Sequence, residues 1–456
     1  MAAMPQTLFD KIWDLHHIAD TAGGSALIAI DRIFLHERTG ASALNAMAEA
    51  GRKVLDPARV FAVMDHIVDT RRGRTDGTLM KGGEGFITQT RAACHAAGIT
   101  LFDVNDADQG ITHVISPELG IVLPGCTLIA PDSHTCTQGA FGALAWGIGS
   151  SEAEHAMVTG ALRIQKPKTM RVTFVGTLPA GVTAKDMILA LLAQEGAGGG
   201  AGHVVEFAGE AVRNLDMEAR MTLCNMATEF AAFTGIIGVD RTTTDYLRGR
   251  RYAPDPLPDW SDLVSDTDAA FDREISIDAG TLRPMVTWGT SPGHAAPLGD
   301  PIPDDADAKV LTYIGLKAGQ SVEGLPIDVA FIGSCTNSRL SDLRRAAALV
   351  QGHHVADTVK VALVVPGSSA VKRAAEAEGL DQIFTDAGFE WRESGCSLCF
   401  YAGGESFPPG SRVISSTNRN FEGRQGPGIK THIASPEVVA ASALAGRIVA
   451  PNGDKG

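Results

Sequence analysis

The chain has 456 residues, and at about 100–200 residues per domain this length predicts two to four domains and excludes a small single module. Hydrophobic residues make up 44% of the sequence and charged residues 20%, a balance that excludes an intrinsically disordered chain. The formal net charge of −14 argues against a large basic face for nucleic acid, although a local group of arginines can still bind an anion.

The seven cysteines are sparse and odd in number, which does not fit a disulfide framework. The N-terminal segment lacks a basic region that leads into an apolar one, and no apolar run approaches the roughly 18 residues of a membrane helix. We therefore expect a cytoplasmic protein with reduced cysteines and without a membrane segment.

Short apolar runs alternate with helical patterns along most of the chain. Near the start, residues 7–20 predict an amphipathic helix with Thr7 as its cap. The runs that predict buried strands are 25–34, 99–104, 119–125, 127–132, 169–176, 327–333, 359–367 and 412–418. The patterns that predict helices are 85–98, 150–164, 183–196, 339–352 and 369–379. This alternation indicates an α/β fold with parallel sheets.

Two polar stretches are candidate boundaries, one at 165–168 and one within the proline-rich, aperiodic region 252–307. They divide the chain into three α/β units, 1–166, 167–282 and 283–456. We find no internal repeat, and the glycine-rich loop at 196–202 is the one low-complexity patch. That loop precedes an apparent strand, so it does not fit a dinucleotide fingerprint, and we interpret it as a close-packing loop that presents Glu206.

Three cysteines form the strongest chemical signal. Cys335 stands between an expected strand and an expected helix, a position where α/β sheets bind ligands, and Cys396 and Cys399 form a CxxC pair. Three thiolates suit an iron–sulfur cluster with one open iron, or zinc with one added histidine. A redox CxxC pair and buried cysteines without a chemical role remain alternatives.

Three histidines lie in compact polar settings, and a carboxylate beside an imidazole supports acid–base chemistry. They are His66 after Asp65, His113, and His134 after Asp132. Each pair taken alone is more often an ordinary loop turn or a satisfied structural hydrogen bond.

Two arginines, Arg419 and Arg424, follow the expected strand at 412–418. Their guanidinium groups can bind carboxylates or phosphates, and the alternative is a pair of solvated surface arginines. The segment 289–293 matches GxSxG, but Pro292 lacks the N–H that an oxyanion hole needs, so a serine hydrolase is not expected.

Taken together, the motifs resemble the aconitase superfamily, and within it the large subunits of isopropylmalate dehydratases. The similarity covers nearly the whole chain, and its most specific segments are PDSHT, IGSCTNSR, GCSLC and STNRNFEGRQG. It implies three α/β/α domains of the aconitase type around a cluster site, without the swivelling fourth domain of monomeric aconitases.

The resemblance also implies roles for individual residues. Cys335, Cys396 and Cys399 would hold one [4Fe–4S] cluster whose fourth iron is open to substrate. Three pairs match the catalytic His–carboxylate pairs of this family: His66 with Asp65, His113 with Asp132, and His134 with Glu206. The residues matching the substrate-binding set are Ser133, Asn418, Arg419 and Arg424.

The implied activity is that of a hydro-lyase on a substituted malate, most simply the interconversion of 2- and 3-isopropylmalate in leucine biosynthesis. The implied partner is a small subunit of roughly 150–200 residues that carries the base and further substrate contacts. The segment 400–410 departs from the usual isopropylmalate enzymes, as do Cys136 and residues 367–370, so citramalate, dimethylmaleate and homoaconitate remain alternative substrates. A non-enzyme alternative is an iron-responsive RNA-binding protein, against which the acidic charge argues; a zinc-stabilised structural subunit is a further one.

Overall fold

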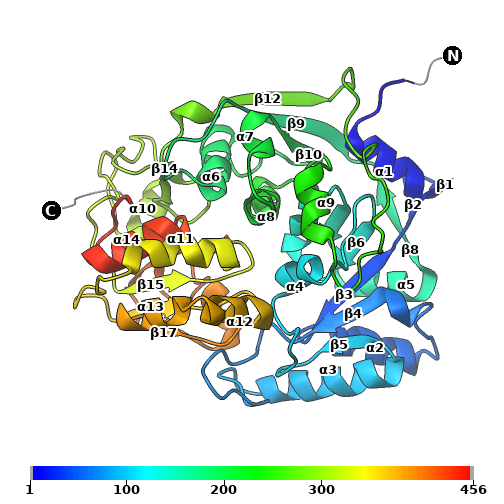
Figure 1. Cartoon of the computed structure of the whole chain (residues 1–456), viewed down its shortest axis with the longest axis horizontal. Coiled ribbons are helices and arrows are strands. Elements are labelled where there is room, and N and C mark those ends of the chain that lie inside the picture. Colours follow the sequence, from blue (N-terminus) through cyan, green and yellow to red (C-terminus); the bar gives the residue numbers. More distant parts are fainter. Residues whose placement is uncertain (1–3, 452–456) are drawn as a thin grey trace.

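The computed structural model describes residues 4–451, in which parallel sheets alternate with helices (Figure 1). Figure 1 shows the N-terminal part of the chain on the right, the middle part at the top and the C-terminal part on the left. Within residues 4–451 the strands form two five-stranded sheets and sheets of four, three and two strands. The α/β class expected from the sequence is confirmed.

The first five-stranded sheet is parallel, with the order β5-β4-β3-β6-β7. Its strands are β3 (Arg32–His36), β4 (Val60–Val63), β5 (Thr100–Phe102), β6 (Thr127–Ala130) and β7 (Leu144–Gly147). The helices around it are α2 (Gly40–Glu49), α3 (Gly83–Ala97), α4 (Thr112–Glu118) and α5 (Ser150–Thr159). Along β3, Ile33 and Leu35 enter one core and Phe34 enters another, so both faces are buried and the strand reads as a continuous apolar run.

A three-stranded antiparallel sheet accompanies the first sheet. It consists of β1 (His17–Thr21), β2 (Ser25–Ala29) and β8 (Ala161–Gln165). The expected first helix is α1 (Leu8–His16), and the Thr7 side chain accepts a hydrogen bond from the backbone N–H of Asp10, as a cap should. The helix is shorter than expected, because residues 17–21 pair with β2 as a strand.

The four-stranded sheet is parallel, with the order β11-β10-β9-β12. Its strands are β9 (Lys168–Val175), β10 (His203–Ala208), β11 (Thr234–Ile236) and β12 (Arg273–Asp278). The accompanying helices are α6 (Ala184–Glu195), α7 (Glu210–Arg213), α8 (Met217–Asn225) and α9 (Arg241–Leu247). The edge strand β12 was not expected, and it shows the alternation of a half-buried strand, with Ile275 and Ile277 buried between exposed residues.

The second five-stranded sheet is parallel, with the order β17-β16-β15-β18-β19. Its strands are β15 (Val329–Ile332), β16 (Val361–Val364), β17 (Glu390–Trp391), β18 (Arg412–Ser415) and β19 (Lys430–Ile433), and β13 (Met285–Thr287) pairs with β14 (Ala295–Pro297) separately. The helices of this part are α10 (Ala308–Ile314), α11 (Leu340–Val350), α12 (Ser369–Ala377), α13 (Leu380–Asp386) and α14 (Pro436–Ala445).

The strand expected at 119–125 is wrong, because this segment is a loop after α4. Gly120 and Gly125 have φ values of +71° and +78°, which a strand cannot accommodate. Ile121 and Val122 are nevertheless buried. The segment is apolar because it fills the core, and its backbone is not extended.

The three parallel sheets occupy residues 32–147, 168–278 and 329–433 in turn. One continuous core contains Phe34 and Phe61 from the first sheet together with Phe174 and Phe207 from the four-stranded sheet. A separate core lies around the last sheet. The division at 166/167 and 282/283 stays a prediction. No helix in residues 4–451 combines the length and the apolar character that a bilayer crossing requires.

Gly139 offers a test of how the first two parallel sheets pack. It lies in the 3₁₀ segment η2 (Ser133–Phe141), and a Cβ at this position would overlap the carbonyl oxygen of Gly235 in β11. We expect Gly139→Ala to destabilise the protein by about 1–3 kcal/mol through overpacking. Thermal unfolding of this variant is best compared with that of Gly198→Ala, where a Cβ meets no atom within 4 Å. Equal midpoints for the two variants would contradict this packing.

Candidate active site and metal centre

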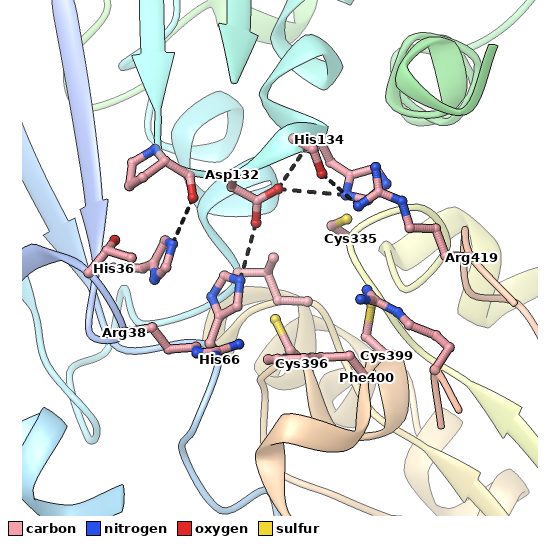
Figure 2. Close-up of a pocket in the computed structure, with 15 residues that line it drawn as sticks. His36, Arg38, His66, Asp132, His134, Cys335, Cys396, Cys399, Phe400 and Arg419 are labelled. Atoms are coloured by element: carbon pink, nitrogen blue, oxygen red, sulfur yellow. Dashed lines mark hydrogen bonds and ion pairs between the residues drawn. The ribbon is translucent and has the colours of Figure 1, made fainter. Parts of the chain in front are cut away.

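The candidate site is a cavity of about 310 Å³ between the first and the last parallel sheet (Figure 2). The lining residues that come from the first part of the chain include His36, Arg38, His66, Asp132, Ser133 and His134. Those that come from the last part are Cys335, Cys396, Cys399, Phe400, Arg419 and Arg424. Side chains that are far apart in the sequence therefore line the same cavity.

Strand ends explain this convergence. On the first sheet, β3 ends at His36, β4 leads into Asp65 and His66, and β6 leads into Asp132. Because parallel strands place their carboxyl ends at one edge, these side chains gather there. On the last sheet, β15 leads to Cys335 and β18 to Asn418 in the same way.

Asp132 is the centre of the histidine cluster. Its Oδ2 lies 3.2 Å from Nε2 of His66, and its Oδ1 lies 3.2 Å from Nε2 of His113. The backbone N–H of His134 donates to Oδ1 at 2.8 Å, because Asp132 caps η2. Burial alone would raise the pKa of Asp132, but these contacts hold it well below its usual range. The carboxylate is therefore charged at neutral pH.

His66 is held as an imidazolium. Its Nδ1 bonds Oδ1 of Asp65, and the other oxygen of Asp65 accepts the backbone N–H of Thr112 at 2.9 Å. Burial opposes the charge, but the carboxylates of Asp65 and Asp132 outweigh it and raise the pKa of His66 well above its usual value. A protonated imidazole at the cavity can donate a proton.

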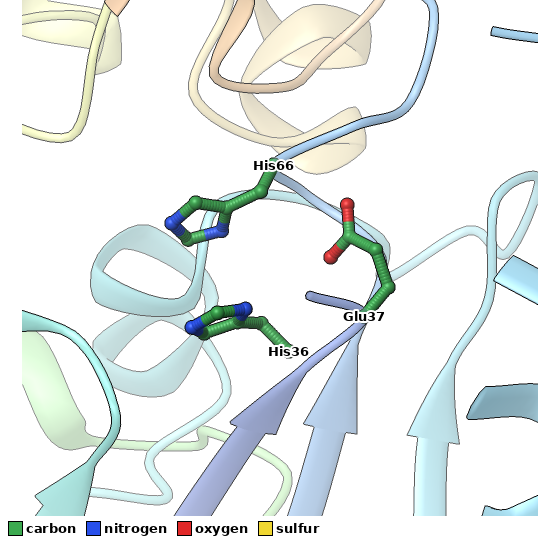
Figure 3. Close-up of side chains that lie close together, drawn as sticks. All are labelled: His36, Glu37 and His66. Carbon is green, nitrogen blue, oxygen red and sulfur yellow. The ribbon is translucent and has the colours of Figure 1, made fainter. Parts of the chain in front are cut away.

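His36, Glu37 and His66 form a compact group beside the cavity (Figure 3). The rings of His36 and His66 stack with centroids 4.1 Å apart, and burial lowers the pKa of His36 to about 4, so His36 is neutral. Glu37 accepts the backbone N–H groups of Asp65 and Ile67. Because Glu37 and His66 are already bonded, we interpret the group as a support for His66 and not as a metal site.

The three cysteines fit a metal centre. Asn225 and Asn418 donate side-chain N–H groups to Sγ of Cys335 at 3.2 and 3.3 Å, and the Ser334 hydroxyl lies 3.3 Å from Sγ of Cys399. Burial raises the pKa of Cys335 to about 12, so a thiolate here needs a cation beside it. No fourth cysteine lines the cavity in the part of the chain that the structure describes. This donor set suits an iron–sulfur centre with one position left open.

The arginines add positive charge to the cavity wall. Arg419 donates from Nη1 to the hydroxyl of Ser133 at 2.8 Å, and its Nε lies 2.6 Å from a carboxylate oxygen of Glu229. Arg424 reaches Sγ of Cys399 at 3.6 Å. Guanidinium groups held in this way can bind a dicarboxylate.

The expected pairing of His134 with Glu206 is wrong. His134 Nε2 lies 3.0 Å from Oε1 of Glu229, in the 3₁₀ segment η3 (Met226–Phe230) after α8. Glu206 lies on β10 outside this cavity, because the strand register places it beside Arg171 of β9, whose Nη2 lies 3.1 Å away. Ser265 also donates to Glu206.

Sequence reasoning missed several other residues of the site. Glu229 lies just beyond the segment RMTLCNMA, one of those that carry the family resemblance, so extending that segment would have found it. Asn225 lies within the same segment and had no assigned role. Lys185 had no signal, because a lysine on a helix is usually exposed. It is fully buried, and its Nζ donates to the carbonyls of Ser416 and Thr417 at 2.9 and 2.8 Å, just before Asn418.

Comparison with known proteins agrees with this geometry. The sequence profile of the aconitase family (aconitate hydratase) matches residues 10–446. The chain is also 50% identical over 459 residues to 3-isopropylmalate dehydratase large subunit 1 of Bradyrhizobium diazoefficiens, with 97% of this chain and 96% of the relative covered. These matches confirm the resemblance that the motifs indicate, including the aconitase type of α/β fold.

Proposed function

Since the chain belongs to the aconitase family, we propose that it is the large, cluster-bearing subunit of a hydro-lyase acting on a substituted malate. The most direct reaction is the interconversion of 2- and 3-isopropylmalate in leucine biosynthesis, because the 50% identical relative is named for that dehydratase. The observation that carries the proposal is the convergence of three cysteines, a protonated histidine and two arginines on one cavity.

The proposed cofactor is one [4Fe–4S] cluster, held by Cys335, Cys396 and Cys399. Such a cluster, when bound, supplies a Lewis acid that polarises the substrate hydroxyl and a neighbouring carboxylate. The support is the donor set of three buried thiols, two of which have N–H groups directed at their sulfurs. The Asn418 amide also bonds Thr336 Oγ1 at 2.8 Å, so its orientation toward Cys335 is fixed.

The chain's own residues have separable tasks in this proposal. Hydroxide is a poor leaving group, and His66 protonates it as it departs, while Asp65 and Asp132 keep the imidazole charged beforehand. Arg419 and Arg424 bind the substrate carboxylates, and Ser133 orients Arg419 through its hydroxyl. Nε2 of His113 and the backbone N–H of His134 contact the other oxygen of Asp132 and hold its carboxylate in position.

The proposed partner is a small subunit that supplies the base for the carbon-bound proton and further substrate contacts. The support is the name of the relative, which is a large subunit. We also propose a cytoplasmic location, in keeping with seven cysteines that are all free thiols.

The substrate can be identified by assaying the chain, reconstituted with its cluster and a small subunit, against isopropylmalate, citramalate and dimethylmalate in parallel. We expect the highest kcat/KM with isopropylmalate and only background rates with the large chain alone. Preference for another acid would reassign the substrate within the same chemistry. Activity on none of them would contradict a hydro-lyase for alkyl-substituted malates, and full activity without a partner would contradict the two-subunit enzyme.

The cluster ligands can be tested by Cys335→Ser. We expect this variant to lose the roughly four irons per chain that a [4Fe–4S] cluster contains, measured by anaerobic iron and sulfide analysis. Cys136→Ser is the matched control, since Cys136 is equally buried but contacts the backbone carbonyl of Asn225 outside the cavity wall. Full iron in Cys335→Ser, or stoichiometric zinc without sulfide in the wild type, would refute the assignment.

The role of Asp65 predicts that its replacement changes the pH dependence of kcat/KM. The pKa of His66 is raised, so the acid form persists to high pH and is lost as the pH rises through that pKa. Asp65→Asn removes an adjacent negative charge and should lower the pKa of His66, which moves the alkaline limb of kcat/KM to lower pH. Asp20→Asn, beside the exposed His17 at 2.9 Å, should leave the profile unchanged. An unshifted alkaline limb in Asp65→Asn would show that another group is the acid.

A further inference from the structure

Phe400 is the large apolar side chain in a cavity wall that is otherwise rich in charged and polar groups. The only other carbon-only side chains among the lining residues that the structure describes are Ile111 and Pro131. Phe400 directly follows Cys399, and Figure 2 shows it beside Cys396 and Cys399, across the cavity from Asp132 and His134. None of the roles argued above uses this ring.

The surroundings of Phe400 match the parts of a substituted malate. The guanidinium carbons of Arg38 and Arg424 lie 5.5 and 5.3 Å from the ring centroid, and the His66 ring meets it edge-on at 5.5 Å. When arginines bind the carboxylates and His66 faces the hydroxyl, the alkyl group on the same short carbon chain must lie within a few ångströms of them. An alkyl group placed against a charged group would desolvate it, whereas the aromatic ring offers apolar contact.

The backbone on both sides of Phe400 is held by hydrogen bonds. Phe400 is extended, with φ −161° and ψ 153°, between the 3₁₀ turns η5 (Ser397–Cys399) and η6 (Tyr401–Gly403). On one side the N–H of Cys399 donates to the carbonyl of Cys396 at 2.9 Å, and on the other the N–H of Tyr401 donates to the carbonyl of Arg424 at 2.7 Å. Because the backbone on both sides of Phe400 is held by hydrogen bonds, this part of the cavity wall can discriminate alkyl groups by size and shape.

We propose that Phe400 is a specificity-determining residue whose ring receives the branched alkyl group of the substrate. This inference rests on the proposed function and deepens it. It assigns selection between isopropyl-substituted and methyl-substituted malates in part to the large subunit, at a position beside the proposed cluster ligands. The ring takes no part in proton transfer.

The test uses the reconstituted, cluster-loaded two-subunit enzyme and the ratio of kcat/KM for isopropylmalate to that for citramalate. A single methylene in an apolar pocket changes kcat/KM by about 10–200-fold, so Phe400→Ala should lower the ratio at least about tenfold. Phe400→Leu keeps an apolar side chain at this position and should lower the ratio less than Phe400→Ala does. The same ordering is expected for binding of isopropylsuccinate over methylsuccinate, which lack the leaving hydroxyl, measured by titration calorimetry.

Phe421→Ala is the matched control. Phe421 also lies beside Arg424, at 5.5 Å from ring centroid to guanidinium carbon, but it does not line the cavity and is 51% exposed. We expect the ratio in this variant to equal that of the wild type. A ratio that changes equally in Phe421→Ala would mean that the effect runs through Arg424, and it would overturn the proposal.

The remaining outcomes separate the inference from the function on which it rests. If Phe400→Ala and Phe400→Leu lower kcat/KM equally for both acids, the role of Phe400 is merely structural and the proposal is overturned. If Phe400→Ala loses iron, Phe400→Leu is the variant to use. An unchanged ratio of kcat/KM for the two acids in Phe400→Leu would also overturn the proposal. A wild-type enzyme inactive on both acids would contradict the proposed function itself, and the inference with it.

Discussion

Asp132 places a negative charge in the buried space between the first and the last parallel sheet, where a lone carboxylate would be unfavourable. The rings of His66 and His113 and the backbone N–H of His134 contact this carboxylate. His66 is held in its cationic form because it contacts Asp65 as well as Asp132. The charge state and the geometry of the site thus arise from one shared carboxylate, which is itself fixed because it caps η2.

The carboxyl edges of two parallel sheets supply the opposite walls of the cavity. The first wall carries the acid–base groups, and the second carries the thiols and the anion-binding arginines. This division separates a proton donor from the ligands of a cationic centre while leaving both open to one small molecule. A substrate that needs a proton at its hydroxyl and cations at its carboxylates fits between them.

Two helices that accompany the four-stranded sheet, α6 and α8, contact the site with one side chain each. Lys185 at the start of α6 holds two carbonyls in the turn that leads to Asn418, and burial lowers the pKa of its amine to about 7. Asn225 at the end of α8 donates to Cys335. Both contacts join residues of the middle part of the chain to the last sheet. The middle part therefore orients the cysteine side of the site although Glu206, the residue expected from it, lies elsewhere.

The α/β class, most of the buried strands and the identity of the chemical groups could be predicted from the order of the amino acids. This was possible because strand periodicity, helix caps such as Thr7, and polar residues at strand ends are local features of the chain. Apolarity alone was insufficient at 119–125, where two glycines with positive φ make a buried loop. Three features could be seen only in the folded chain: the pairing of His134 with Glu229, the burial of Lys185, and the position of Phe400 among Arg38, Arg424 and His66. These contacts join segments far apart in the chain, and strand register and core packing determine them, so no local pattern in the sequence encodes them.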